Sequence, residues 1–429
     1  MTSPEVIGKR IRETRQKLNL SQAQLAHPEL SDSYISLIES GNRTPTPTAL
    51  KIIASKLNCS VEFLIHGVES ERIRKIEDSL TEARQALEGG ARSRARQIYL
   101  DVLSEPDLRL LPQHYREAKY GSALAAEACG DLDEAIRALV ALREDNGPLS
   151  DEIRIGSALA LSRCYRDRGE LDQAIDVAER ELAAWAEKGW TDHLIELGST
   201  LLSAYFERGD LLRAEQYASQ LLAAAEELGT PRAIVAVNWN AAILAESTGR
   251  YEEALARAER AWAIQKVSGE PRNRARLHAT YIDIRLRVRP DEAAACRDEL
   301  LQAERELQDS AASTLDLAYC QYLLCRAEIE LGHAERAAEY ALAALKLMGK
   351  TNNGALAEVQ VILGRAYQML NRVDEAARAL KAAAEALAKE PTNRLTAELW
   401  LMAAAVWQDL GDQKSSRQAY QRAMECGGV

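Results

Sequence analysis

The chain has 429 residues, of which 47% are apolar, and a formal net charge of −11. A chain of this length can bury a large core and is too long for one ordinary domain, and its acidic balance argues against a protein that coats nucleic acid with its whole surface. Residues 1–66 nevertheless hold eight Lys and Arg against six Asp and Glu, a charge of +2, which leaves −13 for the rest. A slightly basic head on an acidic body is typical of a small anion-binding module joined to a separate solvated body.

The cysteines and the hydropathy of the chain indicate its compartment. The seven cysteines are an odd number without a Cys-x-x-Cys pair, which favours free thiols in a reducing environment. The first residues, MTSPEVIGKR, lack an apolar signal core, and no apolar run approaches the roughly 18 residues that a membrane span needs. We therefore expect a soluble, cytoplasmic protein.

The sequence pattern of the head, residues 1–66, predicts five short helices. On the first, Ile7, Ile11 and Leu18 form an apolar stripe. Ser21 followed three residues later by Gln24 is a capping box that opens the second helix, which we expect to end near residue 27. The remaining three helices each begin at a polar cap and continue with inward apolar residues: Ser31 with Ile35 and Ile38, Thr46 and Pro47 with Leu50, Ile53 and Leu57, and Ser60, with an end near Gly67.

The stretch LSQAQLA…LSDSYISLIESGNRTP resembles the helix-turn-helix domain of the phage-repressor, or XRE, type over residues 6–66. In that family the second motif helix lies in the major groove and the first crosses the DNA backbone. The resemblance implies phosphate contacts from Gln22 and Arg43 and a structural pair between Arg15 and Glu39. The residues it assigns to double-stranded DNA are Gln22, Ser31, Asp32, Ser33, Tyr34, Ser36, Leu37, Asn42 and Arg43.

The head departs from the family pattern in two places. The HPEL segment between the motif helices is one residue shorter than usual and holds Pro28 where Gly is usual. The angle at which the chain enters the recognition helix can therefore differ from that of the family. Asp32 is acidic where a phosphate lies near, and it would repel unless it accepts a hydrogen bond from cytosine N4. The alternative is a degenerate head that binds no DNA. A single half-site is too short for genomic specificity, so we expect a homodimer formed through the repeats.

A second pattern recurs from Gly90 onward: a Gly or small residue, a few polar residues, and an Ala five positions later. It is seen in GDLDEA, GELDQA, GDLLRA and GRYEEA, and nine units follow each other at steps of 40, 39, 40, 40, about 40, 43, 39 and 40 residues. Such a period indicates stacked repeats. In each unit Gly ends one helix, an acidic residue opens the next, and Ala lets the two helices approach closely, so each unit predicts a helical hairpin.

These units resemble tetratricopeptide repeats over residues 72–426. The Leu-Gly-x-x-Tyr element survives best in LGRAY, at Leu363, Gly364 and Tyr367. A hairpin cannot bury its apolar face alone, so the repeats must stack into a solenoid with a concave side. The expected fold is all-α: a five-helix, lambda-repressor-like domain over 1–67, a linker or helix over 68–78, and a solenoid of about nine hairpins over 79–429.

Superposing the repeats predicts which side chains face the concave side. The candidates are polar or aromatic and fall mainly on the middle repeats: Arg163, Glu196, Ser199, Thr200, Ser203, Asn238, Trp239, Asn240, Arg276, Thr280, Asp283, Tyr322, Arg326 and Arg365. The sharpest signal is AVNWNAA, because two Asn are locally unfavourable inside a helix and an amide can bind a peptide backbone. Peptide-responsive quorum-sensing regulators resemble this layout and use groove Asn residues in that way. Equally, these Asn could bond neighbouring helices, and the Arg residues could be solvated.

The sequence gives little support for metal binding, cofactor binding or catalysis. Five tryptophans, Trp185, Trp190, Trp262, Trp400 and Trp407, fall where core packing is the default. The six histidines have no metal-ligand spacing, and no phosphate-binding glycine motif occurs. We therefore expect no metal, no cofactor and no catalysis.

The two parts together suggest a transcriptional regulator whose solenoid binds a peptide, a small ligand or a protein partner and so modulates operator binding. The rival hypothesis is an interaction scaffold of tetratricopeptide repeats with weak or autoregulatory DNA binding.

Overall fold

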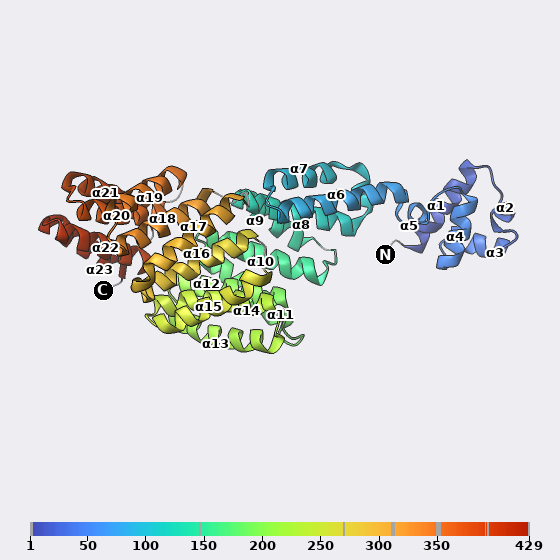
Figure 1. Cartoon of the computed structure of the whole chain (residues 1–429). Helices are drawn as coiled ribbons and strands as arrows, with labels where there is room; N and C mark the ends of the chain where they lie inside the picture. Colours follow the sequence, from blue (N-terminus) through green and yellow to red (C-terminus); the bar gives the residue numbers. More distant parts are fainter. Residues whose placement is uncertain are drawn as a thin grey trace. The chain divides into compact units, whose positions relative to one another are not determined.

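The computed structural model describes residues 3–145, 147–268, 271–309, 314–348, 353–390, 392 and 394–427, and every secondary-structure element in them is helical. The chain divides into two compact units, Met1–Arg168 and Gly169–Val429, which are described separately below. Within each unit, neighbouring helices of the repeats lie side by side (Figure 1).

The first unit holds the head and the first repeats. Its helices, with one 3-10 turn, are α1 (Pro4–Lys17), α2 (Gln22–Ala26), α3 (Asp32–Glu39), α4 (Pro47–Lys56), α5 (Val61–His66), α6 (Ser70–Glu88), α7 (Arg92–Ser104), η1 (Pro106–Leu110), α8 (Pro112–Ala128), α9 (Leu132–Glu144) and α10 (Asp151–Asp167).

The predicted caps of the head are all present. The Ser21 hydroxyl accepts from the Gln24 amide while the Gln24 side chain accepts from the Ser21 amide, which completes the capping box. Helices α3, α4 and α5 begin at the predicted caps, Ser31, Thr46 and Ser60. The side chains of these caps accept hydrogen bonds from amide groups that a helix leaves unpaired at its start. Only a few residue types can do this, so the caps could be predicted from the sequence.

The inward stripe of α1 was predicted wrongly at one position. Ile7 and Ile11 are buried in the core of the head, but Leu18 is 45% exposed. Helix α1 ends at Lys17, and Leu18 is its C-cap. The helical periodicity therefore stops one residue before Leu18, and the side chain turns to solvent.

The segment 68–78, for which a linker or helix is expected, mostly forms the first half of α6. Ile73 and Ile76 of this helix are buried in the same apolar cluster as Tyr99 of α7 and Ala118 of α8. The first helical hairpin of the repeats is thus built from α6 and α7. Gly121 of α8 allows this close packing, because a Cβ there would meet the Tyr99 ring at 2.2 Å.

The second unit holds the remaining repeats. Its helices are α11 (Leu171–Trp185), α12 (Asp192–Arg208), α13 (Leu211–Leu228), α14 (Pro231–Ser247), α15 (Tyr251–Ser268), α16 (Pro271–Val288), α17 (Ala293–Asp309), α18 (Thr314–Glu330), α19 (Ala334–Met348), α20 (Asn353–Met369), α21 (Val373–Leu387), α22 (Arg394–Asp409) and α23 (Gln413–Gly427), with the 3-10 turn η2 (Pro290–Glu292) before α17.

The all-α fold with about nine hairpins is confirmed in the described residues. The turns between paired helices fall at the predicted positions, and the backbone has positive φ at Gly90, Gly130, Gly169, Gly209, Gly249, Gly332, Asn371 and Gly411. The sixth turn, at Arg289, differs: φ is −130° and η2 follows it. Arg, unlike Gly or Asn, rarely adopts the left-handed region, and at this turn a 3-10 turn carries the chain into α17.

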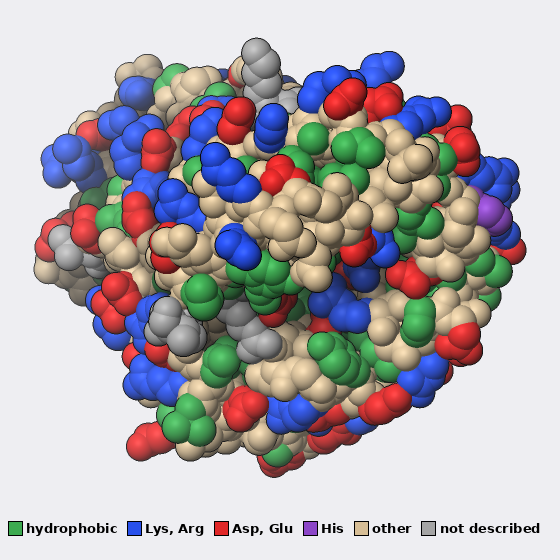
Figure 2. All heavy atoms as spheres, turned by 90° about the vertical axis from the view of Figure 1, so that its left-hand side faces the viewer, with side chains coloured by type: hydrophobic (Ala, Val, Ile, Leu, Met, Phe, Trp, Pro, Cys, Tyr) green, Lys and Arg blue, Asp and Glu red, His purple; other side chains and the backbone are tan. Residues whose placement is uncertain are grey.

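The charged surface is mixed rather than polarised on the face shown in Figure 2, where Lys and Arg side chains lie among Asp and Glu side chains. Many charged side chains of the second unit form ion pairs between repeats, such as Arg208 with Asp172 and Arg289 with Glu252. Among the described residues, no helix is long and apolar enough to cross a membrane.

Replacing Gly209 by Ala isolates the conformational requirement of a turn. The φ of Gly209 is 90°, and no atom lies within 4 Å of a Cβ built there, so only backbone strain opposes the substitution. We expect Gly209→Ala to lower the free energy of unfolding by about 1 kcal/mol, and Gly209→Asn by less, because Asn tolerates this region better. Urea unfolding followed by circular dichroism measures both; an Ala variant as stable as the Asn variant contradicts the strain argument.

Candidate functional site: nucleic-acid interface and ligand groove

A buried carboxylate holds the helix-turn-helix together. Glu39 at the end of α3 accepts two hydrogen bonds from Arg15 of α1, at 2.6 and 2.9 Å, and one from the Gln22 side chain of α2, at 2.8 Å. The side chain of Glu39 is only 3% exposed. The hydrogen bond to this carboxylate raises the pKa of Arg15. One carboxylate thus sets the positions of three helices relative to each other, as the sequence resemblance implies for the Arg15–Glu39 pair.

The face of α3 opposite this core is open to solvent. Ile35 and Ile38 are buried, whereas Asp32, Ser33, Ser36 and Leu37 are exposed. These four side chains are spaced as one outward face of a helix. Helix α3 therefore presents the short polar surface that a recognition helix offers to base edges.

The HPEL turn between α2 and α3 is secured from α4. The Lys56 ammonium donates to the carbonyl of Ala26 at 3.2 Å and pairs with the Glu29 carboxylate. His27 lies 3.2 Å from Asp32, Nε2 to Oδ1. The turn is thus fastened in the absence of the usual Gly, and the Asp32 carboxylate already has a partner within the chain.

The loop after α3 carries the exposed cation of the interface. The Arg43 guanidinium lies 5.0 Å from the ring centroid of Tyr34, a cation–π arrangement. The Tyr34 hydroxyl accepts from the amide of Thr46, and the Asn42 side chain donates to the Ser40 hydroxyl. Arg43 is therefore oriented by a ring that is itself fastened to the start of α4.

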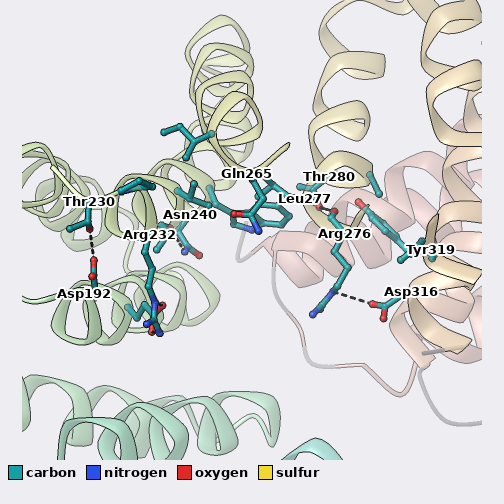
Figure 3. A pocket seen from close by; sticks show the side chains of 18 of the residues that line it. Asp192, Thr230, Arg232, Asn240, Gln265, Arg276, Leu277, Thr280, Asp316 and Tyr319 are labelled. Carbon is teal, nitrogen blue, oxygen red and sulfur yellow. Dashed lines mark hydrogen bonds and ion pairs between the residues drawn. The ribbon is translucent and has the colours of Figure 1, made fainter. Parts of the chain in front are cut away.

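A second candidate site is a groove of about 1110 Å³ in the second unit, here called the ligand groove. It is lined by the first helices of successive repeats, α12, α14, α16 and α18, together with residues near the ends of α15 and α17. Figure 3 shows Asn240 and Gln265 opposite Arg276, Thr280 and Tyr319. Apolar walls come from Trp239, Leu277 and Leu315 among others.

Part of the predicted set lines the ligand groove: Glu196, Trp239, Asn240, Arg276 and Thr280. The remaining predicted residues lie elsewhere and have partners within their own unit or are buried: Arg163, Ser199, Thr200, Ser203, Asn238, Asp283, Tyr322, Arg326 and Arg365.

The two Asn of AVNWNAA have different environments. Asn238 is 1% exposed and donates to the carbonyl of Ile234 at 2.8 Å. Asn240 lines the groove; its Nδ2 donates to the carbonyl of Ala236 at 2.9 Å, and its Oδ1 accepts from the Ser203 hydroxyl at 2.7 Å. The side chain is thus held in one orientation and keeps one further N–H and one further lone pair available.

The charges that line the groove are paired across neighbouring repeats. Arg232 binds Glu196 with two hydrogen bonds, the second at 2.8 Å. Arg276 lies 3.0 Å from Asp316, and its side chain is 56% exposed. Arg276 is therefore a half-exposed cation that a ligand can reach.

Deeper groups form a buried polar network beside the groove. Asp283 accepts from the Tyr319 hydroxyl at 2.9 Å and pairs with Arg326, and the Tyr322 hydroxyl donates to Glu358 at 2.5 Å. Burial, with the nearby Asp283 carboxylate, holds the pKa of Tyr319 well above its usual range. Burial also raises the pKa of Glu358. These groups are committed to each other and join α16, α18 and α20.

Several groove residues were not predicted: Asp192, Thr230, Arg232, Gln265, Leu315 and Asp316. The superposition of repeats concentrated on positions six and nine residues before each turn. Asp192, Arg232 and Asp316 instead lie in the first turns of α12, α14 and α18, and Gln265 lies on a second helix. A recurring polar residue in the first turn is the signal that could have found three of them, while Gln265 depends on how the repeats curve.

Comparison with known proteins supports both parts. A family model described as helix-turn-helix matches residues 11–64. No curated protein matches the chain. Similar solved structures include a Rap protein complexed with competence and sporulation factor, with 12% identity over 82% of this chain and 98% of that chain and a TM-score of 0.56. The apo form of RapI has 16% identity over 82% and 97%, with a TM-score of 0.53. The apo form of the quorum sensor NprR from B. thuringiensis has 15% identity over 82% and 99%, with a TM-score of 0.50.

These findings define the class of protein. The head is a helix-turn-helix DNA-binding domain of the XRE type. The helices behind it have the tetratricopeptide-like repeat fold that is also found in Rap, RapI and the quorum sensor NprR. At these sequence identities the likeness of the repeats establishes their fold alone.

Removing the charge of Glu39 tests its role as the centre of the head. In Glu39→Gln the Arg15 guanidinium, whose side chain is 11% exposed, loses its carboxylate partner and keeps only the Leu20 carbonyl, and breaking a largely buried ion pair costs roughly 3 kcal/mol. We expect the head to unfold more easily by about that amount, with weaker DNA binding. Hydrogen exchange of the α1 and α3 amides measures the first effect and a gel-shift titration the second. Glu13→Gln, which alters an exposed pair with Lys9 at 3.9 Å, is the matched control, and equal effects of the two variants would refute the assignment.

Proposed function

We propose that the protein is a sequence-specific transcriptional regulator in which the ligand groove binds a peptide, a small ligand or a protein partner, and that occupancy of the groove modulates operator binding. One observation carries the proposal: a helix-turn-helix domain with an exposed recognition face and a groove of about 1110 Å³ occur in one chain. The solved quorum sensor NprR has a similar fold over 82% of this chain.

The lining of the groove favours a short peptide over a protein surface. Asn240 is held by two hydrogen bonds and offers both a donor and an acceptor, which is what a peptide backbone requires. Trp239 and Leu315 provide apolar walls for side chains. The half-exposed Arg276 provides a cation for a carboxylate. A ligand carboxylate at Arg276 would compete with Asp316 and so alter a link between α16 and α18.

Sequence-specific DNA binding by this head requires two copies of the chain. Residues 1–66 carry a charge of only +2, so the phosphate attraction of one head is modest. One recognition helix reads only a few base pairs, and dimers present two such helices about one DNA turn apart. We therefore propose a homodimer joined through the repeats, in which the groove acts by changing the separation of the two heads.

Charge reversal of Arg43 together with Gln22→Ala tests DNA binding. Both substitutions remove side chains that the family resemblance assigns to phosphate contacts, so we expect affinity for the protein's own promoter region to fall at least about tenfold and the salt dependence to become shallower. The Gln22 side chain also donates to Glu39, so melting temperatures must show that the variant head stays folded. Lys9→Glu is the control, because this exposed lysine of α1 changes charge equally without lying in the motif. Fluorescence anisotropy at several salt concentrations makes the measurement. Unchanged binding in the double variant rejects the regulator hypothesis and leaves the scaffold as the better account.

Asn240→Leu tests the groove. We expect native mass spectrometry of freshly purified protein with a promoter fragment to show a dimer and a retained ligand mass, and Asn240→Leu to lose that ligand, since a missing hydrogen bond weakens binding about fivefold to tenfold. Gln302→Leu changes an exposed amide of α17 outside the groove and serves as control. A ligand retained equally by both variants, or operator affinity that does not differ between loaded and empty protein, contradicts the proposed coupling.

A further inference from the structure

Asp32 is the one charged side chain on the outward face of α3, a helix that the structure describes in full. Glu39, the other charged residue of this helix, is buried at its far end, and the remaining outward side chains are Ser33, Ser36 and Leu37. Asp32 stands in the first turn of α3, and its side chain is 54% exposed. In helix-turn-helix domains the first residues of the recognition helix contact base edges. Asp32 is therefore placed to meet a base.

A carboxylate accepts hydrogen bonds but donates none, and this limits the bases that Asp32 can read. In the major groove guanine offers two acceptors, and thymine offers an acceptor and a methyl group, so neither base suits a carboxylate. Adenine offers an amino donor beside the N7 acceptor, whereas cytosine offers its N4 amino donor alone. Cytosine is therefore the base that fits Asp32 best. The neighbouring serines both donate and accept, so they add no such selection.

Contacts within the head fix the backbone on both sides of this carboxylate. The Ser31 hydroxyl accepts from the Tyr34 amide at 3.2 Å and so caps α3 directly before Asp32. In the preceding HPEL turn, the Lys56 ammonium donates to the carbonyl of His27. The His27 ring extends from this anchored backbone, and its Nε2 lies 3.2 Å from Oδ1 of Asp32. The second oxygen, Oδ2, has no hydrogen bond within the described part of the chain and is available to a base.

The charge at the start of α3 depends on the protonation of His27. Histidine is the side chain that changes charge between about pH 5 and 8, and its contact with Asp32 is an ion pair only when the ring is protonated. Among the described residues, the other charged group in contact with His27 is Lys56 of α4, which is itself paired with Glu29. A protonated His27 therefore offsets the negative charge that Asp32 brings toward the DNA phosphates.

We propose that Asp32 determines specificity for a cytosine, whose N4 amino group donates to Oδ2, and that His27 is a positioning residue that holds Oδ1 and offsets the charge of the carboxylate. This inference rests on the proposed sequence-specific DNA binding and goes beyond it, because it names a base and the side chain that selects it. Each half-site of the operator then contains a C·G pair opposite the start of α3.

Asp32→Asn tests the assigned base. Selection of binding sites from random duplex DNA by the full-length protein should give half-sites with one fixed C·G pair, whose replacement by T·A weakens binding about tenfold. Asn pairs best with adenine, so the Asp32→Asn variant should select A at that position and keep the rest of the site. Glu29→Gln is the matched control, because it removes a carboxylate from the preceding turn instead of from α3. This variant should keep the C·G pair.

The pH profile of binding tests His27. Protonation of His27 lowers the net negative charge at the start of α3, so affinity for the selected site should rise about threefold as the pH falls from about 8 to about 6. His27→Gln should remove this rise and reduce the preference for C·G, and Asp32→Asn should also flatten the profile. His193→Gln, in α12 of the second unit, should retain both properties. Fluorescence anisotropy gives the affinities, and melting temperatures confirm that the variants fold.

The outcomes separate this inference from the proposed function. A selected site without a fixed C·G pair, a C·G preference that survives Asp32→Asn, or a pH profile that His27→Gln leaves unchanged overturns the inference and leaves sequence-specific binding intact. Failure of the unaltered protein to select any site overturns both.

Discussion

Polar side chains link the first helix of one repeat to the first helix of the next in both units, and in the second unit the shape of the groove depends on such links. They recur about 36 residues apart: Glu127 with Arg163, Asp283 with Tyr319, and Tyr322 with Glu358 are each separated by 36, and Ser203 with Asn240 by 37. A hairpin alone cannot bury its apolar face, so stacking is obligatory. Apolar burial drives the stacking but is not directional. Buried hydrogen bonds and ion pairs require a defined geometry, and they therefore set how each repeat lies on the last.

The pairing of charged side chains between repeats determines which cations of the groove are accessible to a ligand. Arg163, Arg326 and Arg365 look like ligand-binding cations in the sequence, but each is paired with an acidic residue of a neighbouring repeat. Arg276 is also paired, yet its side chain is 56% exposed. A ligand that binds Arg276 would enter a contact that already joins two repeats. Binding and repeat geometry are thus carried by the same atoms, which is the physical basis of the proposed coupling.

In the head, too, polar contacts of a buried side chain fix the positions of helices relative to each other. Glu39 is buried and joined to α1 and α2 through Arg15 and Gln22. Gln22 therefore has a structural role in the free protein besides the phosphate contact that the family resemblance implies. Gly8 adds a steric constraint, because a Cβ there would stand 2.0 Å from the carbonyl oxygen of Ile38. The exposed face of α3 depends on these buried contacts.

The features that the sequence by itself determined are those set by local signals, that is, by residues close to one another in the chain. Caps at Ser21, Ser31 and Thr46 and the turn glycines act within a few residues of where they stand, and the 40-residue period needs only repetition, so the all-α fold, the head and the hairpin count were predictable. Only the tertiary structure decided that Asn240 faces the groove while Asn238 is buried, that Gln265 joins the lining, and that Trp190 is exposed instead of packed in the core. These outcomes depend on the curvature of the stacked repeats and on contacts between residues tens of positions apart, and no local pattern records either.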